Sequence, residues 1–362
     1  MNNGPRLSVI IVNFETPDHT IEGVRSIFAF PPSCGFEVIV VDNGSRDGSL
    51  DVIRQACPEA ACIETGRNLG FGTANNLGIH NARGEYVLLL NSDAHLLEPA
   101  LDRMMRALDA EPAVGAVGPR LENADGRLEW SWGYFPSLLR EVIRKMAHRG
   151  LSLGDPRAVR YVEMQCVASK QADWITAACF MAPRRVLLEA GLFDEGFFMY
   201  FEDIDLCRRI QQKGYKVLYE PAVRALHHGG VSASKNRLRA QVEYRRSQIH
   251  FSRKHFGPAG ALAVKKLLLF KHLIYFVRGG LAYALLRGRA RTSVYTKLLL
   301  SKKTIEMVFG KRSISEPHPV RPPRSLRRFL PRIDWTPIRS FFLLVCAVLA
   351  FGALALLAFA SP

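Results

Sequence analysis

The sequence predicts an α/β fold with a mostly parallel central sheet. Short apolar runs, rich in β-branched residues or strongly hydrophobic, lie at 7–14, 36–42 and 85–90. Helical patterns separate and follow these runs, at 20–30, 49–55 and 72–82. Continuous apolar runs that alternate with helices are typical of strands buried on both faces of a parallel sheet.

The alternation continues to residue 219 with one interruption. Further strands are predicted at 61–64, 114–118, 173–181 and 214–219, and a further helix at 98–110. Pro183 and Gly191 bound a short helix, because proline is favoured at the first helical position and glycine just past the last. The interruption, residues 122–171, is irregular apart from a basic helix expected at 138–148. Its aromatic residues, including Trp130 and Trp132, indicate either a binding cleft or lid, or an ordinary surface insertion.

Polar side chains follow three of the predicted strands at the point where each strand ends. They are Asn13, Asp42 and Asp93. Ordinary turn chemistry explains any one of them, since Asn and Asp favour turns. Ligands of open α/β sheets bind outside the carboxyl ends of the strands, however, and three successive polar ends favour a binding site there.

A loop rich in glycine and asparagine, GRNLGFGTANNLG, covers residues 66–78. Glycine lets backbone approach a ligand closely, and the Arg67 guanidinium is suited to pair with a phosphate. The loop has neither the P-loop spacing nor the full glycine spacing of a dinucleotide site. Taken alone, this loop does not identify a ligand.

The stretch GLFDEGFFMYFEDIDLCRR, residues 191–209, places three acids directly after an aromatic run. An aromatic wall desolvates a carboxylate and makes it more basic, which favours a catalytic base among Glu202, Asp203 and Asp205. The alternative is structural, because acids complement the dipole of a first helical turn and the aromatics then belong to the core. These residues alone leave both interpretations open.

A second polar motif, ALHHGGVS at 225–232, contains His227 and His228 beside two glycines. The pair is suited to bind a metal or to donate to a phosphate, or it is structural. The seven cysteines show no zinc-type spacing and no CxxC pair, which favours a reducing compartment.

The net charge of +16 requires an anionic partner, and its distribution favours a membrane surface. Lysine and arginine dominate from Lys235 onward and are interleaved with apolar residues. We predict basic amphipathic helices lying on a membrane at 258–312. A nucleic-acid partner is not expected, because zinc-finger, helix-turn-helix and RNA-recognition signatures are absent from the sequence.

The last segment predicts a membrane anchor. Residues 341–360 carry no charge and follow an arginine-rich and proline-rich stretch. A run of this length with basic flanks is typical of a transmembrane helix, with a buried core helix as the alternative. We therefore expect a linker at 313–339, a single anchor at 340–360 and, by the positive-inside rule, a catalytic part on the cytoplasmic face of the inner membrane.

Six ordered motifs resemble one known family. VIIVNFETPD, VVDNGSRDGS, GRNLGFGTANNLGI, LLLNSDAHL, GLFDEGFFMYFEDIDLCRRI and HHGGVS together look like the inverting glycosyltransferases of family 2, which have the GT-A fold, and most like their rhamnosyltransferase branch. The resemblance covers residues 7–257 and implies a catalytic domain at 1–257.

The resemblance implies a role for each matching position. Asp42 corresponds to the acid that holds the nucleotide base, and Asn13 lies on the same pocket. Asn68 and Gly70 correspond to the donor loop, and Arg67 is its neighbour. Asp93 is the remaining carboxylate of a DxD element that is Asn91-Ser92-Asp93 here.

Metal and acceptor roles follow from the same resemblance. Asp93, with His227 as a further ligand, is expected to bind Mg or Mn on the donor diphosphate, since an oxygen-rich site suits a hard cation. Asp203 corresponds to the catalytic base. On the acceptor side we expect four residues: Trp174, Tyr200, Glu202 and Asp205.

The implied reaction is an inverting single displacement. A nucleotide diphosphate sugar, by family resemblance dTDP-rhamnose, would donate its sugar to a hydroxyl of a lipid-linked glycan. An alternative from another class is a catalytically inactive, membrane-bound glycan-binding or scaffold protein, because a fold does not fix a function.

Overall fold

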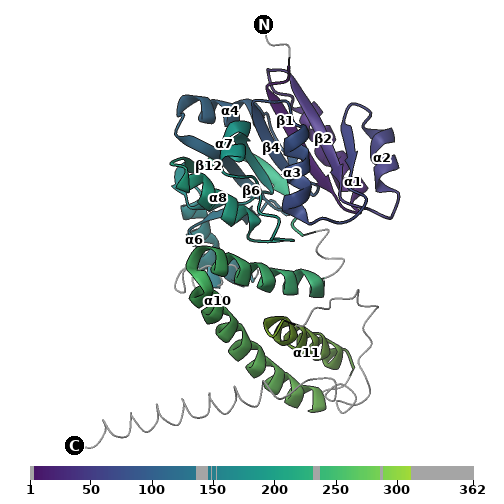
Figure 1. Ribbon diagram of the computed structural model, residues 1–362, viewed down its shortest axis with the longest axis vertical. Helices are drawn as coiled ribbons and strands as arrows, with labels where there is room; N and C mark the ends of the chain where they lie inside the picture. The colour runs from purple at the N-terminus through teal and green to yellow at the C-terminus, as the bar shows by residue number, and fades with distance from the viewer. Residues whose placement is uncertain are drawn as a thin grey trace, which may run out of the picture. The chain divides into compact units, whose positions relative to one another are not determined.

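The computed structural model describes residues 4–135, 146–147, 149–151, 153–230, 237–285 and 288–310. The chain divides into two compact units, one ending at Ala261 and one beginning at Leu262. The first unit contains the main sheet (Figure 1).

The main sheet of the first unit has the order β3-β2-β1-β4-β11-β6-β12-β5. Strands β1, β2, β3 and β4 are mutually parallel, and β12 is parallel to β6, whereas β11 runs antiparallel to both β4 and β6. The α/β prediction with a mostly parallel sheet is confirmed. The path strands are β1 (Leu7–Asn13), β2 (Phe36–Asp42), β3 (Ala61–Glu64), β4 (Tyr86–Asn91), β5 (Ala94–Leu96), β6 (Val114–Glu122), β11 (Cys179–Pro183) and β12 (Lys216–His227).

Helices cover both faces of this sheet (Figure 1). Alternate residues of β1 belong to different cores: Val9 packs with one face and Ile10 with the other. Every residue of β1 is buried, as expected for a central parallel strand. The first core includes side chains of α1 (Pro17–Ala29), α2 (Ser49–Ala56) and α4 (Leu101–Ala110). The second includes α3 (Phe71–Asn81), α6 (Pro156–Gln165), α7 (Arg184–Glu189) and α8 (Glu202–Gln212).

The prediction of one strand at 173–181 is wrong. The chain forms two short strands there, which belong to different sheets. Trp174–Ile175 is β10, which pairs with β8 (Trp132–Gly133) in a separate two-stranded sheet. The main sheet resumes at Cys179. Pro183 ends β11 with extended backbone and precedes α7, where we expected the first helical residue.

The interruption at 122–171 contains more regular structure than predicted. β7 (Leu128–Glu129) pairs with β6, and β9 (Lys170–Ala172) pairs with β12. Most of the basic helix predicted at 138–148 lies outside the described residues.

A long helix, α10 (Arg237–Leu285), crosses the division between the units. It is kinked at Gly257, whose φ of 69° is non-helical, directly before Pro258. In the second unit it is followed by α11 (Gly288–Val308), and His272 Nδ1 lies 3.2 Å from Ser301 Oγ between them. Among the helices that the structure describes, none is long and apolar enough to cross a membrane. The linker and anchor predicted at 313–360 lie outside the described residues.

Candidate active site

A cavity of about 620 Å³ lies in the first unit, where β1 and β4 end. Its wall includes Trp130, Trp132 and Tyr134, so the aromatic part of the 122–171 segment forms a cleft and is not an ordinary surface insertion. The structure brings most of the predicted site residues to this cavity: Asn68, Gly70, Asp93, Trp174, Tyr200, Glu202, Asp203 and His227.

Asn13 and Asp42 lie beside each other at the ends of β1 and β2, as their parallel register requires. The Asn13 Nδ2 group donates to Asp42 Oδ1 over 2.7 Å, and the backbone N–H of Ser45 donates to Asp42 Oδ2 over 3.0 Å. Both side chains are almost completely buried, and neither is among the residues that line the cavity. Their direct structural effect is therefore to fix the turn after β2.

That turn also holds the predicted donor loop, which contains Asn68 and Gly70. Asn43 accepts from the Leu69 N–H over 2.8 Å and donates to the Gly70 carbonyl over 3.2 Å. A Cβ at Gly44 would come within 2.4 Å of the Arg67 backbone, so only glycine permits this approach. The exposed Arg67 side chain does not line the cavity.

The donor loop is joined directly to the acidic stretch. The N–H of Phe71 donates to the Phe198 carbonyl over 3.0 Å. A Cβ at Gly70, which has a φ of 89°, would lie 2.5 Å from that same carbonyl oxygen. Glycine is therefore required here twice over, by its backbone conformation and by the close contact.

A second polar group surrounds His227, at the end of β12. Its Nε2 lies 3.3 Å from Asp93 Oδ1 and 3.3 Å from Asn91 Nδ2, and its Nδ1 lies 2.8 Å from Glu129 Oε2. Burial alone would lower the pKa of His227, but the hydrogen bonds to Asp93 and Glu129 raise it to about 10. The imidazole is therefore a cation that holds two carboxylates when no metal is bound.

The residues around Asp93 fit a hard divalent cation. Asn91 Oδ1 is buried and has no hydrogen-bond partner among the described residues, although a buried carbonyl oxygen normally has one. Together with the Asp93 carboxylate it offers the oxygen ligands that Mg²⁺ and Mn²⁺ prefer. His227 would have to lose its proton to serve as a further ligand.

Asp203 is held at the start of α8, partly exposed to the cavity. Its Oδ1 accepts from the Ile204 N–H over 2.8 Å. Burial raises the pKa of Asp203 above that of an ordinary aspartate, while hydrogen bonds from backbone amides and the Thr176 side chain oppose the increase. Tyr200 and Phe201, directly before the helix, have left-handed φ values of 69° and 68°. Such strain costs on the order of 1–3 kcal/mol per residue and is typical of functional sites.

Glu202 also lines the cavity but is differently placed. Its side chain is buried and Oε2 has no hydrogen-bond partner in the described part of the chain. Burial and, secondarily, the charge of Asp203 raise the pKa of Glu202 well above its usual value. Glu202 therefore keeps its proton to a higher pH than an ordinary glutamate.

Asp205 does not line the cavity, which corrects its predicted place on the acceptor side. Two residues along a helix is a rotation of about 200°, so Asp205 faces away from Asp203. Its fully buried carboxylate contacts Arg209 Nε at 2.8 Å, Lys254 Nζ at 2.9 Å and His255 Nε2 at 2.7 Å. Asp205 therefore joins α8 to α10.

Two residues that contact predicted site residues were not themselves predicted from the sequence. Glu129 contacts His227 from β7, and Thr176 hydrogen-bonds Asp203 from the break between β10 and β11. Each lies in a short segment without periodicity. The polar, aromatic-flanked character of 128–135 is the only sequence signal that points to Glu129.

A solved structure identifies the fold. A mannosyltransferase from Pyrobaculum calidifontis, solved in complex with GDP-Man and Mn²⁺, has the same fold, with a TM-score of 0.50 at 18% identity over 85% of this chain and 88% of that chain. The site has its acids and its donor loop at the ends of the parallel strands, where ligands of such sheets bind. The first unit therefore has the GT-A fold.

Sequence comparisons show which proteins the chain resembles. Residues 8–170 match the model of glycosyl transferase family 2. The N-acetylglucosaminyl-diphospho-decaprenol L-rhamnosyltransferase of Mycobacterium tuberculosis is 28% identical over 247 residues, which are 64% of this chain and 78% of that protein. Rhamnosyltransferase WbbL of Escherichia coli is 26% identical over 203 residues, 53% of this chain and 73% of that protein. Residues 8–170 carry the family 2 match, the chain is similar to rhamnosyltransferases, and it is a glycosyltransferase.

Proposed function

We propose that this glycosyltransferase moves a sugar from a nucleotide diphosphate sugar to a glycan hydroxyl in a single displacement, with Asp203 as the base. The observation that carries the proposal is the place of Asp203. Its carboxylate faces the cavity from α8, and the preceding segment is hydrogen-bonded to the donor loop through Phe71 and Phe198.

Asp203 removes the proton of the acceptor hydroxyl as that oxygen attacks the anomeric carbon. The Ile204 N–H and Thr176 hold the carboxylate in one orientation, and its raised pKa makes it a stronger acceptor of that proton. The C–O bond to the diphosphate breaks in the same step, and the proton remains on Asp203 until product leaves. No covalent sugar intermediate is needed.

The opposite side of the cavity binds the donor. We assign Asn68 and Gly70, which line the cavity, to the diphosphate loop. Asp42 and Asn13 are assigned to the nucleotide base and Arg67 to the outer edge of that loop, although these three side chains do not line the cavity. Asp93 and Asn91 would hold Mg²⁺ or Mn²⁺, with His227 as a further ligand. Once bound, this ion would neutralise negative charge on the leaving diphosphate.

For the acceptor, we propose a lipid-linked glycan on the cytoplasmic face of the inner membrane, and dTDP-rhamnose as the donor. The name of the mycobacterial relative specifies a decaprenol-linked N-acetylglucosaminyl diphosphate as its acceptor. Exposed Leu267, Phe270 and Ile274 follow one face of α10, among several lysines, which supports an association with an anionic membrane surface. In this proposal residues 340–360 are the single anchor.

A transfer assay tests the proposal. Purified full-length protein is incubated with a panel of nucleotide diphosphate sugars, Mg²⁺ or Mn²⁺, and a polyprenyl-diphosphate N-acetylglucosamine acceptor. We expect a glycosylated lipid and release of nucleoside diphosphate with one donor. Glycan binding without transfer from any donor would instead favour the inactive scaffold.

The membrane part has a separate test. Protein truncated before Phe341 is mixed with anionic or neutral vesicles and centrifuged at low salt. We expect it to co-sediment with the anionic vesicles only. Failure to co-sediment with them would remove the surface role of the basic helices without affecting the transfer reaction.

A further inference from the structure

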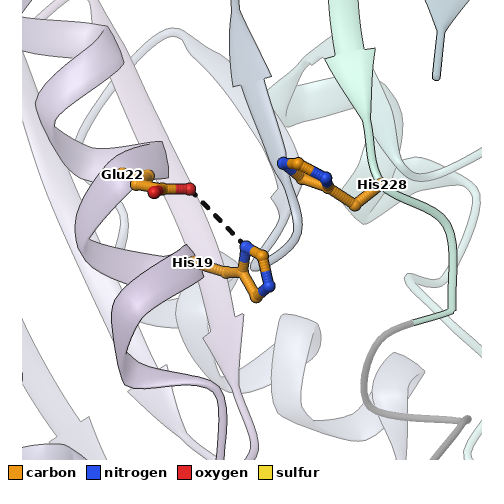
Figure 2. Close-up of side chains that lie close together, drawn as sticks. All are labelled: His19, Glu22 and His228. Carbon is orange, nitrogen blue, oxygen red and sulfur yellow. Dashed lines mark ion pairs between the residues drawn. The ribbon is translucent and has the colours of Figure 1, made fainter. Parts of the chain in front are cut away.

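Three metal-ligating side chains meet outside the cavity. His19 and Glu22 lie on α1, and His228 follows the end of β12 (Figure 2). One ligand atom from each can be chosen so that all three lie within 4.8 Å of one another. Nothing in the displacement reaction uses this group, which we call the α1 histidine cluster.

Local structure brings these residues together. His19 and Glu22 are three residues apart on one helix, so they share a face, and His19 Nδ1 lies 3.5 Å from Glu22 Oε2. His228 is positioned by its N–H, which donates to the Asp93 carbonyl over 2.9 Å. Consecutive residues of an extended chain point to opposite sides. His227 therefore reaches the cavity, and His228 faces α1.

The cluster has hydrogen-bonding capacity that the described protein leaves unused. His19 Nδ1 and His228 Nε2 are buried, and neither has a hydrogen-bond partner among the described residues. The two rings are 4.9 Å apart, and the ring of His95 is 5.6 Å from that of His228. Ring packing explains the short centroid distances. It does not explain why the buried His228 Nε2 has no polar partner among the described residues, which normally costs free energy.

We propose that the α1 histidine cluster binds one transition-metal dication of the Zn²⁺, Ni²⁺ or Co²⁺ type. Two imidazoles and one carboxylate form a ligand set that such ions favour, and Zn²⁺ sites often have three protein ligands and a water. Metal bonds of about 2.0–2.2 Å require the ligand atoms to approach to roughly 3.3 Å. The partly exposed Glu22 has the freedom to close this difference by rotation.

The cluster differs chemically from the donor-metal site beside it. Asp93 and Asn91 offer oxygens to a hard cation, whereas His19 and His228 offer nitrogens to a softer one. A metal here would join α1 to the end of β12, only one residue from His227. The bound ion would therefore stabilise the strand end that carries a donor-side residue.

Binding is measured without any nucleotide sugar, so the outcome is independent of the transfer reaction. Full-length protein, freed of its affinity tag, is titrated with Zn²⁺ by calorimetry and with Co²⁺ by visible absorption, in the presence of excess Mg²⁺. We expect one metal ion to bind per protein molecule. The Co²⁺ complex should show visible absorption bands typical of imidazole ligands. His19→Ala and His228→Ala should each weaken this binding at least tenfold, and His80→Ala, a control at an exposed histidine of α3, should not change it.

Two further variants keep the result interpretable. Glu22→Gln changes a side chain that is 57% exposed, so it should fold normally and still weaken binding. Asp93→Asn should still bind one Zn²⁺ per protein molecule. The proposal is overturned if His19→Ala and Glu22→Gln bind Zn²⁺ like the unmodified protein, or if Asp93→Asn no longer binds Zn²⁺.

Discussion

Asp203 and Asp205 lie two residues apart on α8, and their surroundings differ in almost every respect. Asp203 is partly exposed to the cavity, and its hydrogen bonds come from neutral groups. Asp205 is completely buried and contacts three basic side chains, Arg209, Lys254 and His255. A carboxylate paired with fixed cations is a poor base, whereas one facing a cavity can accept a proton. Within one helical turn, the proposed catalytic base is thus distinguished from a carboxylate that joins two helices.

The largest expected effect is that of Asp203→Asn. The amide keeps the size of the carboxylate but cannot accept a proton, and general-base catalysis contributes about 10²–10⁴-fold to rates. We therefore expect kcat to fall about 10²–10⁴-fold with donor binding nearly unchanged. Steady-state kinetics and donor calorimetry on one preparation check this. An active variant would remove Asp203 from the base role.

Asp205→Asn should act on stability instead. Removing one partner of a buried ion pair leaves uncompensated charge and costs about 3–5 kcal/mol. We expect a large decrease in the unfolding free energy, measured by urea titration, with kcat per folded molecule within about threefold. Asp51→Asn is the control, because the Asp51–Arg54 pair is exposed and such pairs contribute about 0–1 kcal/mol. A selective loss of kcat in Asp205→Asn would contradict the comparison.

Gly70→Ala should break the link between the donor loop and the segment before Asp203. The new Cβ would lie 2.5 Å from the Phe198 carbonyl oxygen, and the left-handed backbone adds strain of about 1 kcal/mol or more. We expect a higher KM for the donor and lower stability. Gly48→Ala is the matched control, since Gly48 also has a positive φ but a Cβ there would have no atom within 4 Å. Equal donor KM values in both variants would show that the contact is unimportant.

The smallest effect is expected for Glu202→Gln. Burial keeps Glu202 protonated to a higher pH than usual, so glutamine resembles the form already present. Activity should stay within about tenfold, and its loss at acidic pH should persist, because protonation of Asp203, whose pKa is raised, removes the base as pH falls. A pH profile of kcat/KM checks both points. A loss as large as that of Asp203→Asn would give Glu202 the catalytic role.

Strands were predictable because each carries its own signal. The limits of β2 and of the partly exposed β3 agree with the prediction, since their apolar runs end at turn-forming residues. The side-chain partners were less predictable. Glu129 and His227 are 98 residues apart and meet only because β7 pairs with the end of β6. Helical periodicity would have separated Asp205 from Asp203, but family resemblance alone does not select a helix face.

The anomeric configuration of the product tests the single displacement most directly. The product of the unmodified enzyme, made from a nucleotide sugar of known configuration, is analysed by NMR. Direct attack by a hydroxyl activated by Asp203 predicts inversion at the anomeric carbon. Retention of configuration would contradict this account of the site.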